Sequence, residues 1–166
     1  MKSVNDVIKE IDLILENATE NTVNKLAPLV QLDRKENHAF SCLELFYMQN
    51  YELIYNSFFV RNRALETVYA SHEGFDGKQS FLPELKEYFI STKNDLNWNQ
   101  NEGIAFTQAH EKQFLEWFKN CWKSAGGENS KIPTYFCFEK EYQVQDIITG
   151  EIMEEEECAR LLGFDI

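Results

Sequence analysis

The stretch YELIYNSFFV, residues 51–60, decides which fold class the sequence predicts. It lies within a longer segment, residues 29–73, that contains no glycine and no proline. Apolar residues from Phe40 to Tyr69 recur mostly three or four positions apart, which is the spacing of one long helix or of two consecutive helices. The density of aromatic and β-branched side chains leaves a strand as the open alternative. We expect helix here.

The segments on either side also show helical spacing. Residues 3–17 form an amphipathic pattern that begins with a capping box of Ser3 and Asp6, and residues 22–32 predict a second, short helix. Proline at position 83 suits the first turn of a helix over residues 83–89. A strong apolar stripe over residues 107–125 predicts a further helix, which ends at the glycine pair that follows.

The character of the sequence changes near its C-terminal end. Residues 134–148 are rich in aromatic and β-branched side chains, and Thr149-Gly150 can turn that extended run back on itself. An acidic run then leads into a short terminal helix that stops at Gly163. Polar, glycine-containing loops are expected over residues 71–80 and 91–103.

Together these patterns predict an α+β protein that is mostly α-helical. We expect a single globular domain over residues 1–166, made of packed helices with a small β-hairpin or sheet near the C-terminus. The helical part covers residues 1–127, and residues 128–166 hold the small β element and the short acidic helix.

Charge and hydropathy exclude several classes of protein. The net charge of −12 argues against a nucleic-acid-binding surface, because phosphate contacts need clustered lysine and arginine. Residues 128–166 hold ten acidic residues against three basic ones, so the excess charge is concentrated there. No signal peptide and no membrane-spanning stretch is evident, and we expect a cytoplasmic protein without a membrane partner.

The four consecutive glutamates at positions 154–157 are the strongest local charge feature. In the first turn of a helix, each well-placed carboxylate gains roughly 0.3–1 kcal/mol from the helix dipole. Four are more than the dipole requires, and like charges packed together repel. The surplus is therefore either a solvated surface or a contact site for a basic partner, and the sequence leaves both open.

No catalytic or metal-binding motif is complete in the sequence. The four cysteines form no CxxC pair and are predicted to be buried thiols, and the HEKQF sequence at His110 lacks the second histidine of a zinc helix. Phosphate-binding glycine loops are absent as well. We expect no enzyme, no cofactor and no metal. His38 and Cys42, four residues apart, would share a helix face and are the best remaining basis for a small enzyme or metal site, together with His110.

These observations favour a non-catalytic, acidic protein-binding module, of the kind expected of an immunity protein or inhibitor that neutralises a basic, nuclease-like toxin or effector. Its alternatives are the small enzyme or metal-binding protein above and a structural or regulatory subunit of an oligomer, packed through the helical face that includes residues 51–60. Trp98 lies in a polar predicted loop, where it either anchors the loop or meets a partner. The predicted partner-binding residues are Asp146, Glu151, Glu154, Glu155, Glu156, Glu157 and Trp98.

Overall fold

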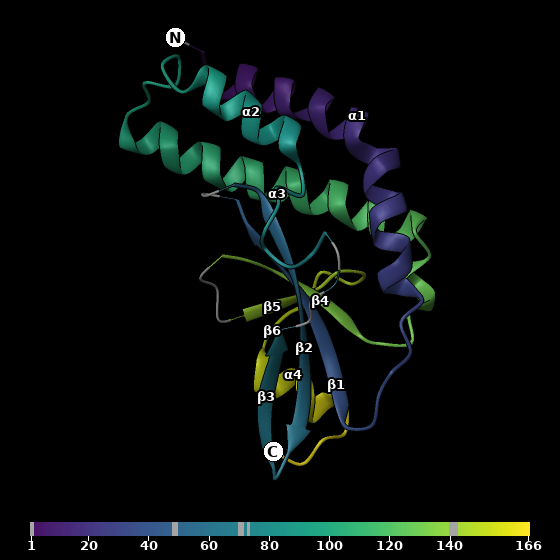
Figure 1. The fold of residues 1–166 in the computed structure, drawn as a ribbon. Helices are drawn as coiled ribbons and strands as arrows, with labels where there is room; N and C mark the ends of the chain where they lie inside the picture. The colour runs from purple at the N-terminus through teal and green to yellow at the C-terminus, as the bar shows by residue number, and fades with distance from the viewer. Residues whose placement is uncertain (1, 48–49, 70–71, 73, 140–142) are drawn as a thin grey trace.

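The protein is an α+β fold in which helices cover a six-stranded mixed sheet (Figure 1). The structure, a computed structural model, describes residues 2–47, 50–69, 72, 74–139 and 143–166. In chain order the elements are α1 (Val4–Val30), β1 (His38–Phe46), β2 (Glu52–Arg61), β3 (Ala64–Tyr69), α2 (Pro83–Thr92), α3 (Gln100–Ser124), η1 (Gly127–Asn129), β4 (Thr134–Phe138), β5 (Gln143–Asp146), β6 (Ile152–Glu154) and α4 (Glu155–Leu161).

The sheet has the strand order β3-β2-β1-β4-β5-β6. All neighbouring strands run antiparallel except β1 and β4, which pair in parallel with Leu43 opposite Phe136. The chain leaves the sheet after β3, forms α2 and α3, and returns as β4 beside β1. Strand β4 therefore lies with β1 in the centre of the sheet, and β5 and β6 extend the sheet to one edge.

The prediction of a mostly helical chain with a small C-terminal hairpin is wrong. The segment around YELIYNSFFV forms three long antiparallel strands, β1 to β3, instead of helices. The first six residues of β1 and the middle of β2 are buried on both faces of the sheet. A strand buried on both faces carries an almost continuous apolar run, and such a run satisfies helical spacing as easily as strand spacing.

The helices largely follow the sequence pattern. α1 begins at the predicted capping box, in which Ser3 and Asp6 satisfy each other's backbone donors, but it continues through both predicted helices as one, with Pro28 in its last turn. α2 begins at Pro83 as predicted. α3 begins earlier than predicted, because Asn99 and Glu102 form a second capping box.

The sheet separates two hydrophobic cores. On one face, Leu43, Leu45 and Tyr55 pack with the buried sides of α1, α2 and α3 in the larger, helix-side core. On the other face, Phe40 and Cys42 pack with α4 and the C-terminal tail in the smaller, α4-side core. Adjacent β1 residues alternate between the two cores because successive side chains point to opposite faces of a strand.

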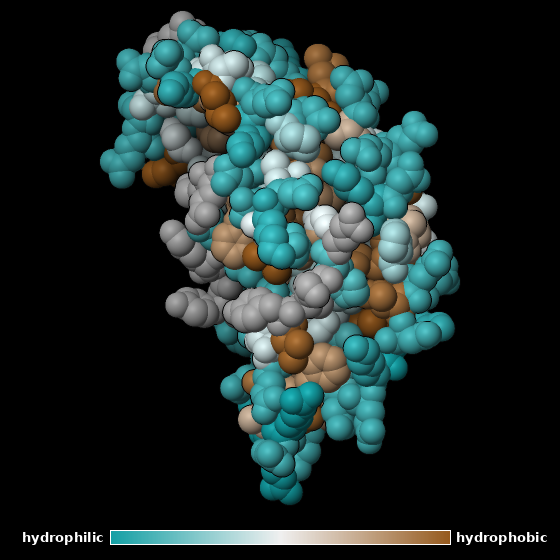
Figure 2. All heavy atoms as spheres, in the orientation of Figure 1, coloured by the Kyte–Doolittle hydropathy of each residue, from teal (hydrophilic) through white to brown (hydrophobic). Residues whose placement is uncertain are grey.

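The C-terminal segment matches its prediction closely. Strands β4 and β5 form within the extended run, a turn at Thr149 and Gly150 leads into β6, and α4 follows directly and ends before Gly163, whose φ is +87°. Of the loop predicted over residues 71–80, Ser71 and Glu73 lie outside the described residues. Within the described part of the chain, no helix has the length and apolar character to cross a membrane. Figure 2 shows hydrophilic side chains over most of the visible face, broken by smaller apolar patches.

Candidate partner-binding surface

The acidic run forms the rim of a hollow at the start of α4. Glu154 is the last residue of β6 and the N-cap of α4, and Glu155, Glu156 and Glu157 occupy the first turn. These four side chains and Arg160 line a hollow of about 690 Å³. The buried side of the helix, Cys158 and Ala159, packs on the sheet and so fixes the carboxylates at this place.

Within this run the four glutamates differ in their surroundings. Glu156 is exposed and pairs with Arg160 one turn later, at 2.9 Å, and a pair of this kind contributes only a few tenths of a kcal/mol. Glu154 accepts a hydrogen bond from the Gln143 amide at 2.9 Å. Glu157 is exposed, whereas Glu155 is half-buried against the sheet. Of the four glutamates, Glu155 is the one whose carboxylate is partly shielded from solvent.

A second half-buried carboxylate, Glu44 of β1, lies near Glu155. Burial raises the pKa of Glu44, and repulsion from Glu139 raises it further, while a hydrogen bond from Asn56 acts in the opposite sense. Burial likewise raises the pKa of Glu155, followed by repulsion from Glu44 and Glu154. We call Glu44, Glu139, Glu154 and Glu155 the carboxylate cluster.

The sheet assembles this cluster from distant parts of the sequence. Parallel pairing places Glu44 of β1 opposite Cys137 of β4, so Glu139, which follows β4, comes close to the same site. Sequence reasoning missed both residues, because in an acidic chain a pair of glutamates carries no information about neighbours in space. A signal was present only in Glu44 itself, a charged residue inside the apolar run of β1.

Asn56 completes the cluster from β2. It lies opposite Cys42 in register, is 4% exposed, and donates a hydrogen bond from Nδ2 to Glu44 Oε2 at 3.1 Å. Within the described residues, the Asn56 Oδ1 atom has no hydrogen-bond partner. Asn56 thus holds Glu44 in place from the neighbouring strand.

Two of the predicted contact residues serve the turn next to the cluster. Asp146 Oδ1 accepts hydrogen bonds from the backbone N–H groups of Ile148 and Thr149, at 2.7 and 2.6 Å, and so shapes the β5–β6 turn. Glu151 is exposed at the end of that turn, with its backbone N–H bonded to the Thr149 hydroxyl. The carboxylate of Asp146 is therefore occupied within the fold, whereas that of Glu151 projects from the same edge of the sheet.

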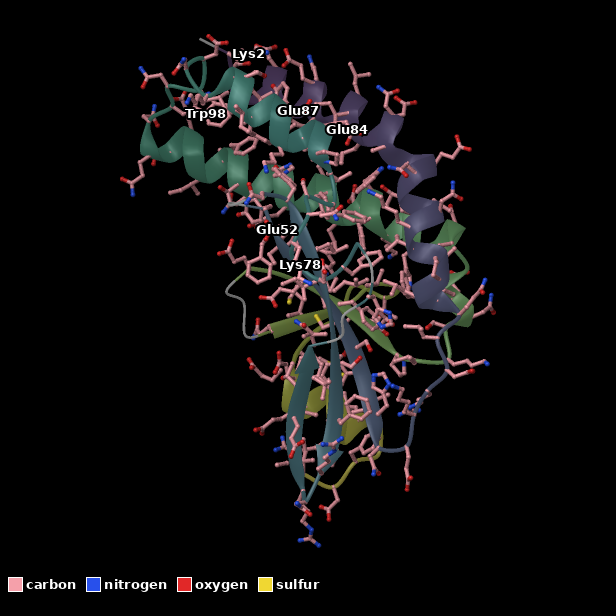
Figure 3. All side chains as sticks on the ribbon, in the orientation of Figure 1. Lys2, Glu52, Lys78, Glu84, Glu87 and Trp98 are labelled. Carbon is pink, nitrogen blue, oxygen red and sulfur yellow. The ribbon has the colours of Figure 1, made fainter. Side chains whose placement is uncertain are left out.

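Trp98 lies at the other end of the molecule from α4 (Figures 1 and 3). Its Nε1 donates a hydrogen bond to the Lys2 carbonyl at 3.0 Å, and its ring packs on Phe106 with centroids 4.9 Å apart. The indole thus joins the α2–α3 connection to the N-terminus. The structure does not bring it together with the acidic residues.

The residues of the enzyme or metal alternative also lie apart. His38 and Cys42 are on a strand and not on a helix, and a register irregularity after His38 leaves its ring stacked on Phe59 while Cys42 lies in the α4-side core. His110 is buried in α3 and bonds the Tyr51 hydroxyl at 2.7 Å, and burial lowers its pKa to about 4. In the described part of the chain, no group of three or more metal-ligating side chains could hold a metal ion.

The four cysteines are free and buried, as predicted. Cys42 and Cys137 lie next to the carboxylate cluster in the α4-side core, and their sulfur atoms are 3.5 Å apart. Burial is the main cause that raises the pKa of Cys42, and it raises the pKa of Cys158 to about 11. The thiols of Cys42 and Cys158 are therefore protonated at neutral pH, which makes them poor nucleophiles. The segment invoked for the oligomer alternative, residues 51–60, lies in the sheet and presents no helical face.

Comparison with known proteins gives no match: no family model matches the chain, and no curated protein or solved structure is significantly similar to it.

Proposed function

We propose that the protein is a non-catalytic binding module that engages a basic protein through the carboxylate cluster and the adjoining glutamates of α4. The single observation that carries this proposal is the pair of half-buried carboxylates, Glu44 and Glu155, held near each other on different elements. A merely solvated acidic surface would leave its charges exposed and separate. These two are withdrawn from water and repel each other, which weakens the fold of the free protein.

Among the described residues, the half-buried pair of Glu44 and Glu155 has no ion-pair partner. Within the same part of the chain, no lysine or arginine forms an ion pair with Glu154 either. A lysine or arginine of a partner would supply a positive charge beside these carboxylates. Arginine is favoured, because its guanidinium can bond two carboxylate oxygens at once.

The net charge of −12 also favours a basic partner, because it attracts positive charge at long range. A strongly acidic surface accelerates association with a basic protein and disfavours acidic ones. Enzymes that act on nucleic acid present basic clefts, because they must hold phosphates. The partner class that best fits is therefore a basic, nuclease-like effector met in the cytoplasm, which the module would inhibit by covering its cleft.

A capture experiment with matched variants tests the proposal. Wild-type protein, a Glu44→Gln/Glu155→Gln variant and a control, Glu16→Gln/Glu20→Gln, are immobilised and exposed to lysate of the source organism at low salt. The control removes the same charge from exposed positions on α1. We expect a basic protein that the wild type and the control retain and that the cluster variant loses.

The cluster variant must also be folded, and thermal unfolding provides that check. The substitutions neutralise two carboxylates that repel each other. We therefore expect the free energy of unfolding of this variant at pH 7 to exceed that of the wild type by about 0.5–1 kcal/mol, which is a common effect of an improved surface charge. Equal retention of every captured protein by all three proteins would contradict the proposal, as would retention of no basic protein by the wild type.

A further inference from the structure

A separate cavity of about 370 Å³ lies on the sheet face that α1 and α3 partly cover. Its polar wall comes from segments far apart in sequence, namely Lys35 before β1, His38 of β1, Tyr55 and Ser57 of β2, and His72 after β3. Apolar side chains, among them Phe59, form the rest of the wall. We call this the polar cavity; it shares no residue with the carboxylate cluster.

A chain of hydrogen bonds leads from the interior to the wall of this cavity. The His38 Nε2 atom lies 3.1 Å from the Phe40 carbonyl oxygen and 3.0 Å from the Ser41 hydroxyl. A carbonyl oxygen can only accept, so this nitrogen carries the ring proton in the neutral histidine. Ser41 accepts from His38 and lies 3.4 Å from the Ser57 hydroxyl, where either oxygen can be the donor; when Ser41 donates, the Ser57 hydroxyl hydrogen is free to point into the cavity.

Tyr55 supplies a second hydroxyl group to the cavity wall. Its side chain is 1% exposed and lines the cavity, and within the described residues its hydroxyl has no hydrogen-bond partner. Burial raises the pKa of Tyr55, and the Ser41 hydroxyl acts in the opposite sense, although the contact between the two hydroxyls does not meet the geometry of an ordinary hydrogen bond. Buried hydroxyls are normally bonded, so an unbonded one on a cavity wall marks a place for a polar ligand atom.

The surroundings of the cavity are positive, although the protein as a whole is acidic. Burial is the main cause that lowers the pKa values of His38 and His72; the charge of Lys35 lowers both further, and that of Arg34 lowers the pKa of His38. Arg34 is held in place by hydrogen bonds from its guanidinium to the carbonyls of His38 and Ala39. Asp33, the acidic residue of the lining, is already paired with Lys131. Lys35 thus brings a positive charge to a wall that also carries the hydroxyl groups of Tyr55 and Ser57.

We propose that the polar cavity binds a small organic oxyanion, a carboxylate or a phosphate monoester, whose charged group accepts hydrogen bonds from Tyr55 and Ser57 beside Lys35. The volume exceeds that of an inorganic anion and falls in the range of small-molecule pockets, so the ligand has an apolar body that lies against Phe59 and its neighbours. This inference is independent of the proposed function. The two sites share no residue, so an experiment can disprove one proposal and leave the other standing.

Calorimetric titration with three probes tests it: benzoate, phenyl phosphate and the neutral benzyl alcohol. We expect one or both anions to bind and benzyl alcohol to bind at least tenfold more weakly; the tighter anion identifies the headgroup. In Tyr55→Phe, binding of that anion should weaken about tenfold or more, since a hydrogen bond to a charged group is lost. The control Tyr135→Phe removes a buried tyrosine hydroxyl on the α4 side and should leave affinity unchanged.

Thermal unfolding of the ligand-free variants separates binding from a structural role of the hydroxyl. Tyr55→Phe should melt at the same temperature as the wild type or higher, because an unbonded buried hydroxyl is removed. Binding of benzyl alcohol as tight as that of the anions would overturn the proposal. Unchanged anion affinity in Tyr55→Phe, or the absence of anion binding to the wild type at millimolar concentration, would do the same.

Discussion

Replacing Phe136 with alanine is expected to lower the free energy of unfolding by about 3–5 kcal/mol, the usual cost of removing a fully buried phenylalanine. Phe136 lies in β4 and is 1% exposed. Its ring contacts Phe118 of α3 at 5.1 Å and Phe138 at 5.0 Å between centroids, and its backbone pairs with Leu43 of β1. Removing it therefore leaves a cavity where the helices meet the middle of the sheet.

The matched control for this variant is Ile152→Ala on the edge strand β6, where the side chain is 60% exposed. A surface substitution of this kind should change stability by no more than about 0.5 kcal/mol. Urea denaturation, followed by circular dichroism and by tryptophan fluorescence, measures both variants. Similar, small effects of the two changes would mean that β4 belongs to a peripheral hairpin, as the sequence suggested, and would contradict the central position described above.

The second large effect is expected from Glu155→Lys, which should weaken binding of the captured basic partner about 100-fold. The introduced lysine would face a cation of the partner in a half-buried site, and such a juxtaposition of like charges weakens binding by several kcal/mol. A 100-fold loss of affinity corresponds to about 2.7 kcal/mol. The free protein should not lose stability, because the new ammonium group lies near Glu44 and relieves its repulsion. Stability and binding are thus expected to respond independently.

Surface plasmon resonance against the captured partner measures this change, with Glu20→Lys as control. Glu20 is exposed on α1, so the control alters net charge equally but leaves the cluster intact. The Glu20→Lys variant should associate with the partner slightly more slowly than the wild type at low salt. At high salt this difference should disappear, since exposed charges are screened. Equal losses in the two variants would show that net charge alone governs binding, and the assignment of the cluster would then be wrong.

Local signals in the sequence predicted the elements whose ends they define. The capping box of Ser3 and Asp6, the proline that starts α2 and the glycine after α4 each act through their immediate neighbours, so their effect can be read without knowing the fold. The acidic run was also placed correctly, at the start of a short terminal helix. Such features depend on backbone donors and dihedral angles within a few residues.

The central strands could not be predicted in the same way. β1 and β2 are apolar because both faces of the sheet are covered, and that burial depends on α3 and α4, which come much later in the chain. Periodicity then carries no decisive information, and the density of β-branched and aromatic residues was the better guide.

The same dependence on strand pairing explains why the sequence did not reveal most residues of the two proposed sites. Glu44 and Glu155 are neighbours only once β1 and β4 have paired and α4 has folded back on them. Tyr55, Ser57 and His38 likewise converge through the pairing of β1 with β2. For Trp98 the sequence left two possibilities open, anchoring the loop or contacting a partner, and the structure shows the indole bonded to the Lys2 carbonyl and packed on Phe106.

The most direct test of the account is an NMR titration of the glutamate carboxyl carbons. Because burial and repulsion favour the neutral form, the pKa values of Glu44 and Glu155 should lie above the ordinary 4.5. Their protonation stabilises the fold at low pH, and this contribution disappears as pH rises through the raised pKa values. Glu10, bonded by Lys2 and Tyr88, is an internal reference whose pKa lies below 4.5.

The titration is then repeated with a hexalysine peptide, which supplies the cation that the proposed partner would bring. The account predicts that the pKa values of Glu44 and Glu155 are raised in the free protein and fall when the peptide binds, because a nearby positive charge favours the carboxylate. Values at or below 4.5 in the free protein, or a peptide response at Glu10 without one at Glu44 and Glu155, would contradict it.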